Sequence, residues 1–197
     1  EPWKIPDMND LPEIKPRKIL EDEDFAPYDH SNEKLSRPWA APGTPGLEHR
    51  IGGLEKWDKT GHVSYDTDNH NYMVNLRQKK VDVISDSFNQ IKPFGDTAGE
   101  LLVLGWGGTY GAIRSAVQRA RVEGKSVSHI HLRNLNPFPN DLSDKLSNYG
   151  QVLIPELNLG QLNSIIRSKF LIDTKTLNKV EGKPFIPSEV YSKINEL

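Results

Sequence analysis

The sequence predicts a three-layer α/β fold with a mainly parallel sheet over residues 95–197, and three observations predict it. Residues 101–104 are an apolar run that leads into a glycine-rich turn and then into a segment with an apolar stripe at helical spacing. Two further apolar segments, 127–132 and 152–154, are each followed by another striped segment. Strands that alternate with helices over short connections are typical of a buried parallel sheet with helices on both faces and right-handed crossovers.

Each element of this domain has its own signal. The helix after the first strand is expected to be capped by Thr109 and to end at Gly124. In the second strand, alternation places His129 and His131 on one face. Leu142, Leu146 and Tyr149 indicate a third helix that ends at Gly150, before the third strand. The remaining apolar positions predict a helix after Gly160, one further strand or hairpin within 171–180, and a terminal helix from Pro187.

Residues 1–65 are expected to run as an extended, acidic and proline-rich linker from a preceding domain that is missing here. Residues 1–36 carry ten acids against five bases, whereas residues 37–197 carry seventeen against twenty. Residues 66–94 predict a connector helix capped by Asp66 or Asp68, whose apolar stripe would pack on the domain at 95–197.

The composition excludes several classes of function. The net charge is −2, so nucleic acid and anionic membrane are not indicated as partners. No apolar run reaches the roughly 20 residues needed to cross a bilayer, so we expect a cytoplasmic location. The chain has no cysteine and therefore supplies no thiolate to an iron–sulfur cluster or a structural zinc.

The glycine-rich turn is the first candidate site. Gly105, Gly107 and Gly108 sit between a strand and a helix, where α/β folds bind phosphate. The dinucleotide fingerprint fails, because Tyr110 replaces its third glycine and no acid ends the second strand. Two interpretations remain: a tight turn for close helix packing, or an anion or subunit contact at the amides of Thr109 and Tyr110.

Other polar residues give weaker signals. His49, His62 and His70, with Asp66 and Asp68, have ligand chemistry, but their spacing matches no metal site, so we predict none. Glu156 stands where α/β sheets place functional carboxylates, yet a structural hydrogen bond to neighbouring amides is favoured. No serine-hydrolase elbow is present, and we assign no catalytic residue.

Several motifs in order resemble those of the alpha subunit of 2-oxoacid:ferredoxin oxidoreductases, 2-oxoglutarate type, in its C-terminal region. The motifs are 43–46, 48–49, 61–66, 69–70, Met73, Arg77, 105–111, 131–133, 137–139, Glu156, Asn158, 160–162 and 182–185. The resemblance implies a domain similar to the C-terminal domain of transketolases. It also implies that Arg133, Pro137, Phe138, Glu156 and Asn158 have interface or structural roles.

By this resemblance, the intact enzyme converts a 2-oxoacid and coenzyme A to an acyl-CoA, carbon dioxide and reduced ferredoxin. Thiamine diphosphate, Mg²⁺ and the iron–sulfur cluster are expected on the beta subunit, because this chain lacks cysteine and the Gly-Asp-Gly motif. The expected partners are that beta subunit, the amino-terminal domains of the alpha subunit and, indirectly, ferredoxin. The alternatives are a stand-alone phosphate- or nucleotide-binding regulatory domain, or the corresponding domain of a 2-oxoacid dehydrogenase or transketolase.

Overall fold

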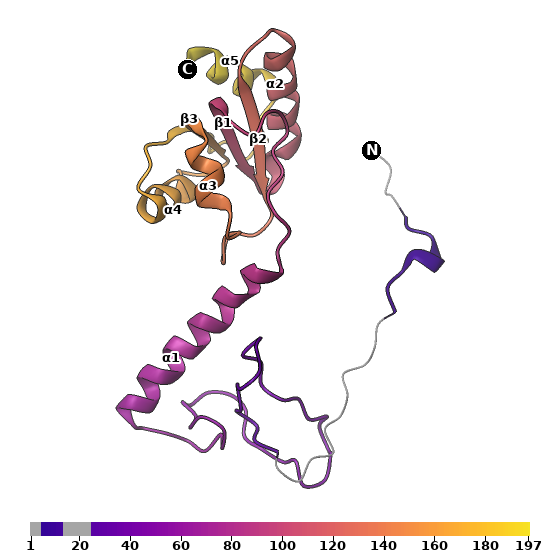
Figure 1. Ribbon diagram of the computed structural model, residues 1–197, viewed down its shortest axis with the longest axis vertical. Helices are drawn as coiled ribbons and strands as arrows, with labels where there is room; N and C mark the ends of the chain where they lie inside the picture. The colour runs from indigo at the N-terminus through magenta and orange to yellow at the C-terminus, as the bar shows by residue number, and fades with distance from the viewer. Residues whose placement is uncertain (1–4, 14–24) are drawn as a thin grey trace. The chain divides into compact units, whose positions relative to one another are not determined.

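A four-stranded parallel sheet organises the C-terminal part of the computed structural model, which describes residues 5–13 and 25–197 (Figure 1). The sheet order is β2-β1-β3-β4. Its strands are β1 (Gly99–Trp106), β2 (Val127–Leu132), β3 (Tyr149–Glu156) and β4 (Lys175–Asn178). Val103 of the central strand pairs with His129 on one side and with Leu153 on the other. The predicted parallel sheet is confirmed.

Helices cover both faces of this sheet, as Figure 1 shows. One face packs on α2 (Tyr110–Val122) and α5 (Pro187–Glu196), and the other on α3 (Leu142–Ser147) and α4 (Gln161–Phe170). Successive β1 residues point to opposite faces: Leu101 and Val103 belong to the α2/α5 core, and Leu102 and Leu104 to the α3/α4 core. The expected three-layer αβα architecture is therefore confirmed.

Two details of the expected elements differ. Tyr149, expected on the third helix, is the first residue of β3, and α3 ends at Ser147. The Tyr149 hydroxyl donates to the backbone oxygen of Asp96 at 2.7 Å, and the Tyr149 ring is buried in the α3/α4 core. Tyr149 lies at helical spacing from Leu142 and Leu146 in the sequence, but it is not part of their helix. All three side chains are buried in the α3/α4 core.

The segment before β1 also pairs with the sheet. Phe94 and His129 exchange two backbone hydrogen bonds, of 2.8 and 2.9 Å, in an isolated antiparallel bridge at the outer edge of β2. Ser128 donates to the backbone oxygen of Asp96 at 2.9 Å, which fixes the same segment from its other end. This edge strand of the sheet is therefore covered rather than free.

Residues 1–80 and 81–197 form two compact units. From residue 25 to residue 66 the first unit has no helix, only turns and isolated bridges, and a short 3₁₀ turn spans Met8–Asp10. The expected linker at 1–4 and 14–24 lies outside the described residues.

Helix α1 (Thr67–Asp82) is followed by the 3₁₀ segment Val83–Ser87. Asp66 accepts the Asn69 amide at 2.8 Å, as the predicted cap requires. Within the first unit, Met73 and Leu76 of this helix line a cavity together with Tyr28 and His30.

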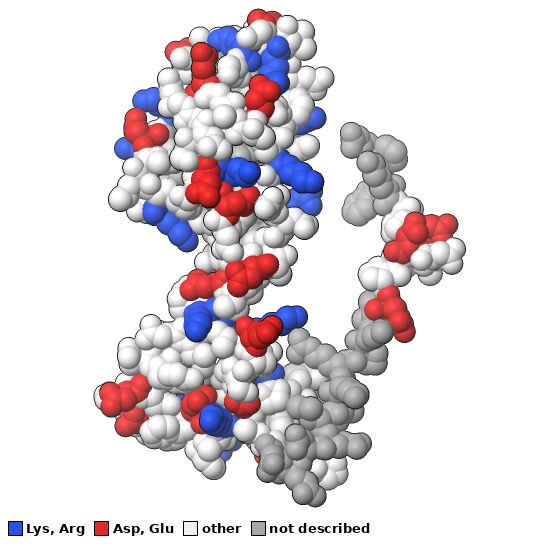
Figure 2. Space-filling view, viewed as in Figure 1, with Lys and Arg blue, Asp and Glu red and all other residues white. Residues whose placement is uncertain are grey.

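The surface agrees with the balanced composition. Figure 2 shows lysine and arginine side chains interspersed with acidic ones over the face in view. Among the described residues, no helix is long and apolar enough to span a membrane.

Candidate functional site at the carboxyl edge of the sheet

The polar residues singled out from the sequence gather where the parallel strands end. β1, β2 and β3 end at Trp106, Leu132 and Glu156, so the turns that follow them share one edge of the sheet. Between β1 and β3 the chain connections leave in opposite directions, which is where open α/β sheets form ligand crevices. This edge is therefore the natural place to look for a site.

The glycine turn is built for close packing. A Cβ added at Gly105 would lie 2.6 Å from Ile113 Cδ1 and 3.1 Å from His131 Nδ1, so only glycine fits between β1 and α2. Gly107 has φ +57°, and a Cβ at Gly108 would meet nothing within 4 Å. The turn thus has a structural reason for two of its glycines.

Thr109 does not cap α2 in the predicted way. Its hydroxyl accepts the Trp106 amide at 3.2 Å and donates to the Trp106 backbone oxygen at 2.8 Å. These bonds close the 3₁₀ turn Gly107–Thr109, and no side chain caps the first amides of α2. The expected cap was wrong because the preceding turn uses the hydroxyl locally.

Two histidines and a tyrosine pack together beside this turn. The ring centroid of Tyr110 lies 5.5 Å from that of His129 and 5.1 Å from that of His131. Burial is the main cause that lowers the pKa of His129 to about 3, and the nearby His131 and Arg114 lower it further. Burial also lowers the pKa of His131, against the opposing effect of a hydrogen bond with the Gly107 backbone. Both imidazoles are therefore neutral at pH 7, and His129 Nε2 is buried without a hydrogen-bond partner.

Glu156 is a structural carboxylate. It is fully buried and accepts the amides of Leu162 and Asn163, both at 2.9 Å, and the side-chain amide of Asn158 at 3.2 Å. Asn158 in turn accepts the amides of Gly160 and Gln161. Glu156 therefore caps α4 from the end of β3, as the favoured interpretation of the sequence had it, while Asn158 orders the turn between them.

The turn after β2 contains the other interface candidates. Arg133 is exposed. Pro137 follows a cis peptide bond. Phe138 is buried in the α3/α4 core, with its ring centroid 5.8 Å from that of Phe170. Phe138 is consequently a packing residue in this domain.

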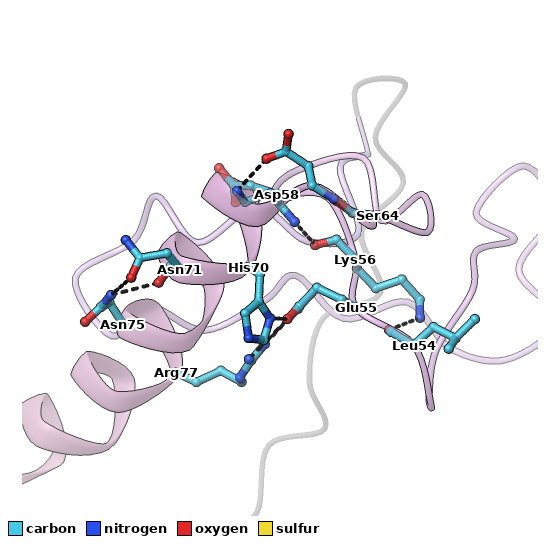
Figure 3. Close-up of polar contacts among 11 residues, drawn as sticks. Leu54, Glu55, Lys56, Asp58, Ser64, His70, Asn71, Asn75 and Arg77 are labelled. Atoms are coloured by element: carbon cyan, nitrogen blue, oxygen red, sulfur yellow. Dashed lines mark hydrogen bonds and ion pairs between the residues drawn. The ribbon is translucent and has the colours of Figure 1, made fainter.

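A second polar cluster lies in the first unit, at the start of α1 (Figure 3). Glu55 accepts from Arg77 through both carboxylate oxygens, at 3.0 and 3.4 Å, and contacts His70 Nδ1 at 2.7 Å. The hydrogen bond from Arg77 is the main cause that lowers the pKa of Glu55 to about 2, against the opposing effect of burial. This cluster ties the loop before Lys56 to the helix.

Several of the residues considered for a metal have local partners instead. Of the histidines considered for a metal, His70 pairs with Glu55 and His49 contacts the Leu47 backbone oxygen, while Asp66 caps α1. In residues 5–13 and 25–197, no group of three or more His, Cys, Asp or Glu side chains could hold a metal ion.

Sequence reasoning missed several residues of the edge region. Phe94, Arg114 and Lys92 line the same cavity as His129 and His131. Arg114 could have been found from its place one helical turn after Tyr110, but nothing in the sequence indicates the pairing of Phe94 with β2. This chain has no cysteine to ligate an iron–sulfur cluster, and its sequence does not contain the Gly-Asp-Gly motif that the resemblance associates with thiamine diphosphate and Mg²⁺.

The fold and the site thus define a class: an αβα domain whose buried carboxylate caps a helix and whose glycine turn serves close packing. Comparison with known proteins gives the family. Residues 99–190 match the family model of the pyruvate:ferredoxin oxidoreductase core domain II. The chain is 49% identical over 191 residues to the 2-oxoglutarate oxidoreductase subunit KorA of Mycobacterium tuberculosis, covering 96% of this chain and 29% of that protein.

Further relatives agree. The 2-oxoglutarate synthase subunit KorA of Methanocaldococcus jannaschii is 30% identical over 118 residues, covering 59% of this chain and 31% of that protein. The solved 2-oxoglutarate:ferredoxin oxidoreductase of Magnetococcus marinus superposes with a TM-score of 0.87 at 30% identity, over 97% of this chain and 34% of that one. The chain belongs to the family of 2-oxoacid:ferredoxin oxidoreductase alpha subunits and spans about a third of the length of these relatives. Neither a stand-alone regulatory domain nor a dehydrogenase or transketolase domain is favoured by these similarities.

Proposed function

We propose that residues 95–197 are the structural and subunit-interface domain of a thiamine diphosphate-dependent 2-oxoacid:ferredoxin oxidoreductase, acting on 2-oxoglutarate in the cytoplasm. The observation that carries the proposal is the 49% identity, over nearly the whole chain, to a subunit named as a 2-oxoglutarate oxidoreductase. The proposed reaction is the oxidative decarboxylation of the 2-oxoacid to an acyl-CoA. The solved relative is described with 2-oxoglutarate, coenzyme A and succinyl-CoA bound, which supports the same substrates here.

The expected location of the cofactors on another subunit supports an assembly role for this domain. Because this chain has no cysteine, any iron–sulfur cluster must be held by other polypeptide. In our proposal the beta subunit holds thiamine diphosphate, Mg²⁺ and the cluster, and the amino-terminal domains of the alpha subunit complete the substrate pocket. Ferredoxin then meets the beta subunit and not this domain.

Exposed apolar side chains at the carboxyl edge support this edge as the interface. Leu157 and Leu159 follow β3 and are 39% and 79% exposed, and Tyr110 at the start of α2 is 51% exposed. The hydrogen bonds of Glu156 and Asn158 hold the turn that carries both leucines. A rigid turn that presents apolar side chains suits a protein interface, because little conformational entropy is lost on binding.

The test uses the complex of the complete alpha subunit with the beta subunit, and measures its dissociation constant by light scattering across dilution. Leu157→Ser and Leu159→Ser should each weaken association by about tenfold or more, since burying a leucine is worth about 1.5–3 kcal/mol. Val122→Ser is the matched control, because Val122 is 84% exposed at the far end of α2. Its complex should be unchanged.

Two outcomes would overturn the proposal. One is a complex that tolerates both leucine substitutions as well as it tolerates Val122→Ser. The other is a complex that still forms at full affinity after residues 95–197 are deleted from the alpha subunit. Reduction of ferredoxin with 2-oxoglutarate and coenzyme A, measured on the same complexes, should fall in step with assembly.

A further inference from the structure

A large open cavity lies within the second unit, along the outer edge of β2. Its walls are the segment 87–94, the start of α2, the histidine face of β2 and the turn at 132–134. Its volume is about 1220 Å³. Small-molecule sites usually measure about 300–1000 Å³, so an elongated ligand of nucleotide size fits with room for water. Gly105, Gly107 and Gly108 do not line the cavity, whereas Tyr110, at the end of the same turn, does.

The charged groups on the cavity wall have one sign. Lys92, Arg114 and Arg133 line it from three different segments, and no aspartate or glutamate stands among its described lining residues. None of the three forms an ion pair with a carboxylate in the described parts of the chain. Three cations on the wall of one cavity, with no carboxylate on the described part of that wall, favour a ligand of multiple negative charge, and arginine forks match phosphate oxygens.

A neutral imidazole also forms part of the cavity wall. His129 lines the cavity but is only 2% exposed, and its Nε2 is closed to solvent. Because this imidazole is neutral at pH 7, it shapes the wall without adding charge and makes no direct hydrogen bond to a bound molecule.

Aromatic side chains complete the wall. Tyr110 is half-exposed and touches the histidines with its ring, so part of the ring remains open to the cavity. The guanidinium of Arg114 stacks on the Phe94 ring, with Cζ 3.0 Å from the ring centroid. This contact orients the arginine, since a stacked guanidinium keeps its edge N–H groups free for hydrogen bonds.

We propose that this cavity binds a diphosphate ester that carries a flat ring, such as a nucleoside diphosphate. Arg114 and Arg133 take the phosphate oxygens, Lys92 adds long-range attraction, and Tyr110 stacks on the ring. The lining residues all belong to this chain, and Tyr110 is also one of the exposed side chains of the proposed interface, so the titration is made without the beta subunit.

The test is calorimetric titration of the 197-residue chain with adenosine diphosphate, inorganic pyrophosphate and adenosine. Adenosine diphosphate should bind more tightly than either of its parts. Arg114→Gln and Arg133→Gln should each weaken adenosine diphosphate and pyrophosphate about tenfold, as expected for one lost charge-assisted contact. Tyr110→Ala should weaken adenosine diphosphate and leave pyrophosphate unchanged.

Arg119→Gln is the matched control, because Arg119 is an arginine of the same helix that stacks on Tyr191 and does not line the cavity. Its affinities should equal those of the unaltered chain. Arg133 is exposed, so its substitution keeps the test valid even where Arg114→Gln lowers the melting temperature. Three results would each overturn the proposal: no binding of adenosine diphosphate at about 5 mM, equal weakening by Arg119→Gln, or equal affinity for adenosine diphosphate and pyrophosphate.

Discussion

Replacing Glu156 by glutamine tests the structural role of the buried carboxylate. The side chain keeps its size, but one acceptor oxygen becomes an N–H donor that faces the amide of Leu162 or Asn163, each of which lies 2.9 Å away. One buried amide then loses its acceptor, which costs about 1–3 kcal/mol. The loss of a negative charge at the amino end of α4 adds about 0.3–1 kcal/mol. We therefore expect the free energy of unfolding to fall by about 1.5–4 kcal/mol.

The assay is urea unfolding of the chain followed by circular dichroism, with the melting temperature as a second readout. A loss of this size lowers the melting temperature by about 3–16 °C for a chain of this length. Glu100→Gln is the control, because Glu100 is an exposed glutamate of β1, and its substitution should change stability by less than about 0.5 kcal/mol. The reasoning is refuted if Glu156→Gln is as stable as Glu100→Gln.

Three further predictions follow from the geometry. Gly105→Ala should lower the free energy of unfolding by about 1–3 kcal/mol, because its Cβ would press on Ile113. Gly111→Ala lies in open space on α2 and should raise the melting temperature slightly. Equal melting temperatures for the two variants would contradict the packing argument. His129 should stay neutral down to about pH 3 in an NMR titration. The free energy of unfolding should fall as pH drops from about 6.5 towards 3, because the unfolded chain takes up the proton first. Titration of His129 near pH 6.5 would refute its burial. Arg77→Gln should move the pKa of Glu55 from about 2 up towards the ordinary glutamate value of 4.5. The stability lost as pH falls between those two values should then shrink. An unchanged pKa in a carboxyl 13C titration would show that Arg77 is not the cause.

The sequence was sufficient to predict the layers of the fold, because strand and helix periodicities alternate clearly from Leu101 onwards. It also predicted that Glu156 serves neighbouring amides, since an acid between a strand and a helix start meets unpaired N–H groups. Local sequence signals gave the wrong element where a side chain could contact either of two neighbouring elements. Thr109 bonds within its own turn, and Tyr149 begins a strand while sharing the core of the helix before it.

The cavity beside β2 could not be predicted in the same way. It depends on the bridge between Phe94 and His129, which are 35 positions apart and carry no pairing signal in their own residue types. Arg114 comes from α2 and Arg133 from the turn after β2, and both line the cavity together with the histidines. Alternation did place His129 and His131 on one face, but which helix and which loop cover that face is decided by tertiary packing.

We propose that this chain serves a redox decarboxylase by packing and assembly, with the cofactors held by other polypeptide. The most direct test compares the purified chain with the complex of the complete alpha subunit and the beta subunit. Iron is measured by elemental analysis, and binding of thiamine diphosphate with Mg²⁺ by calorimetry. We predict neither cofactor in the chain alone and both in the complex. Stoichiometric iron or tight thiamine diphosphate in the isolated chain would contradict the account.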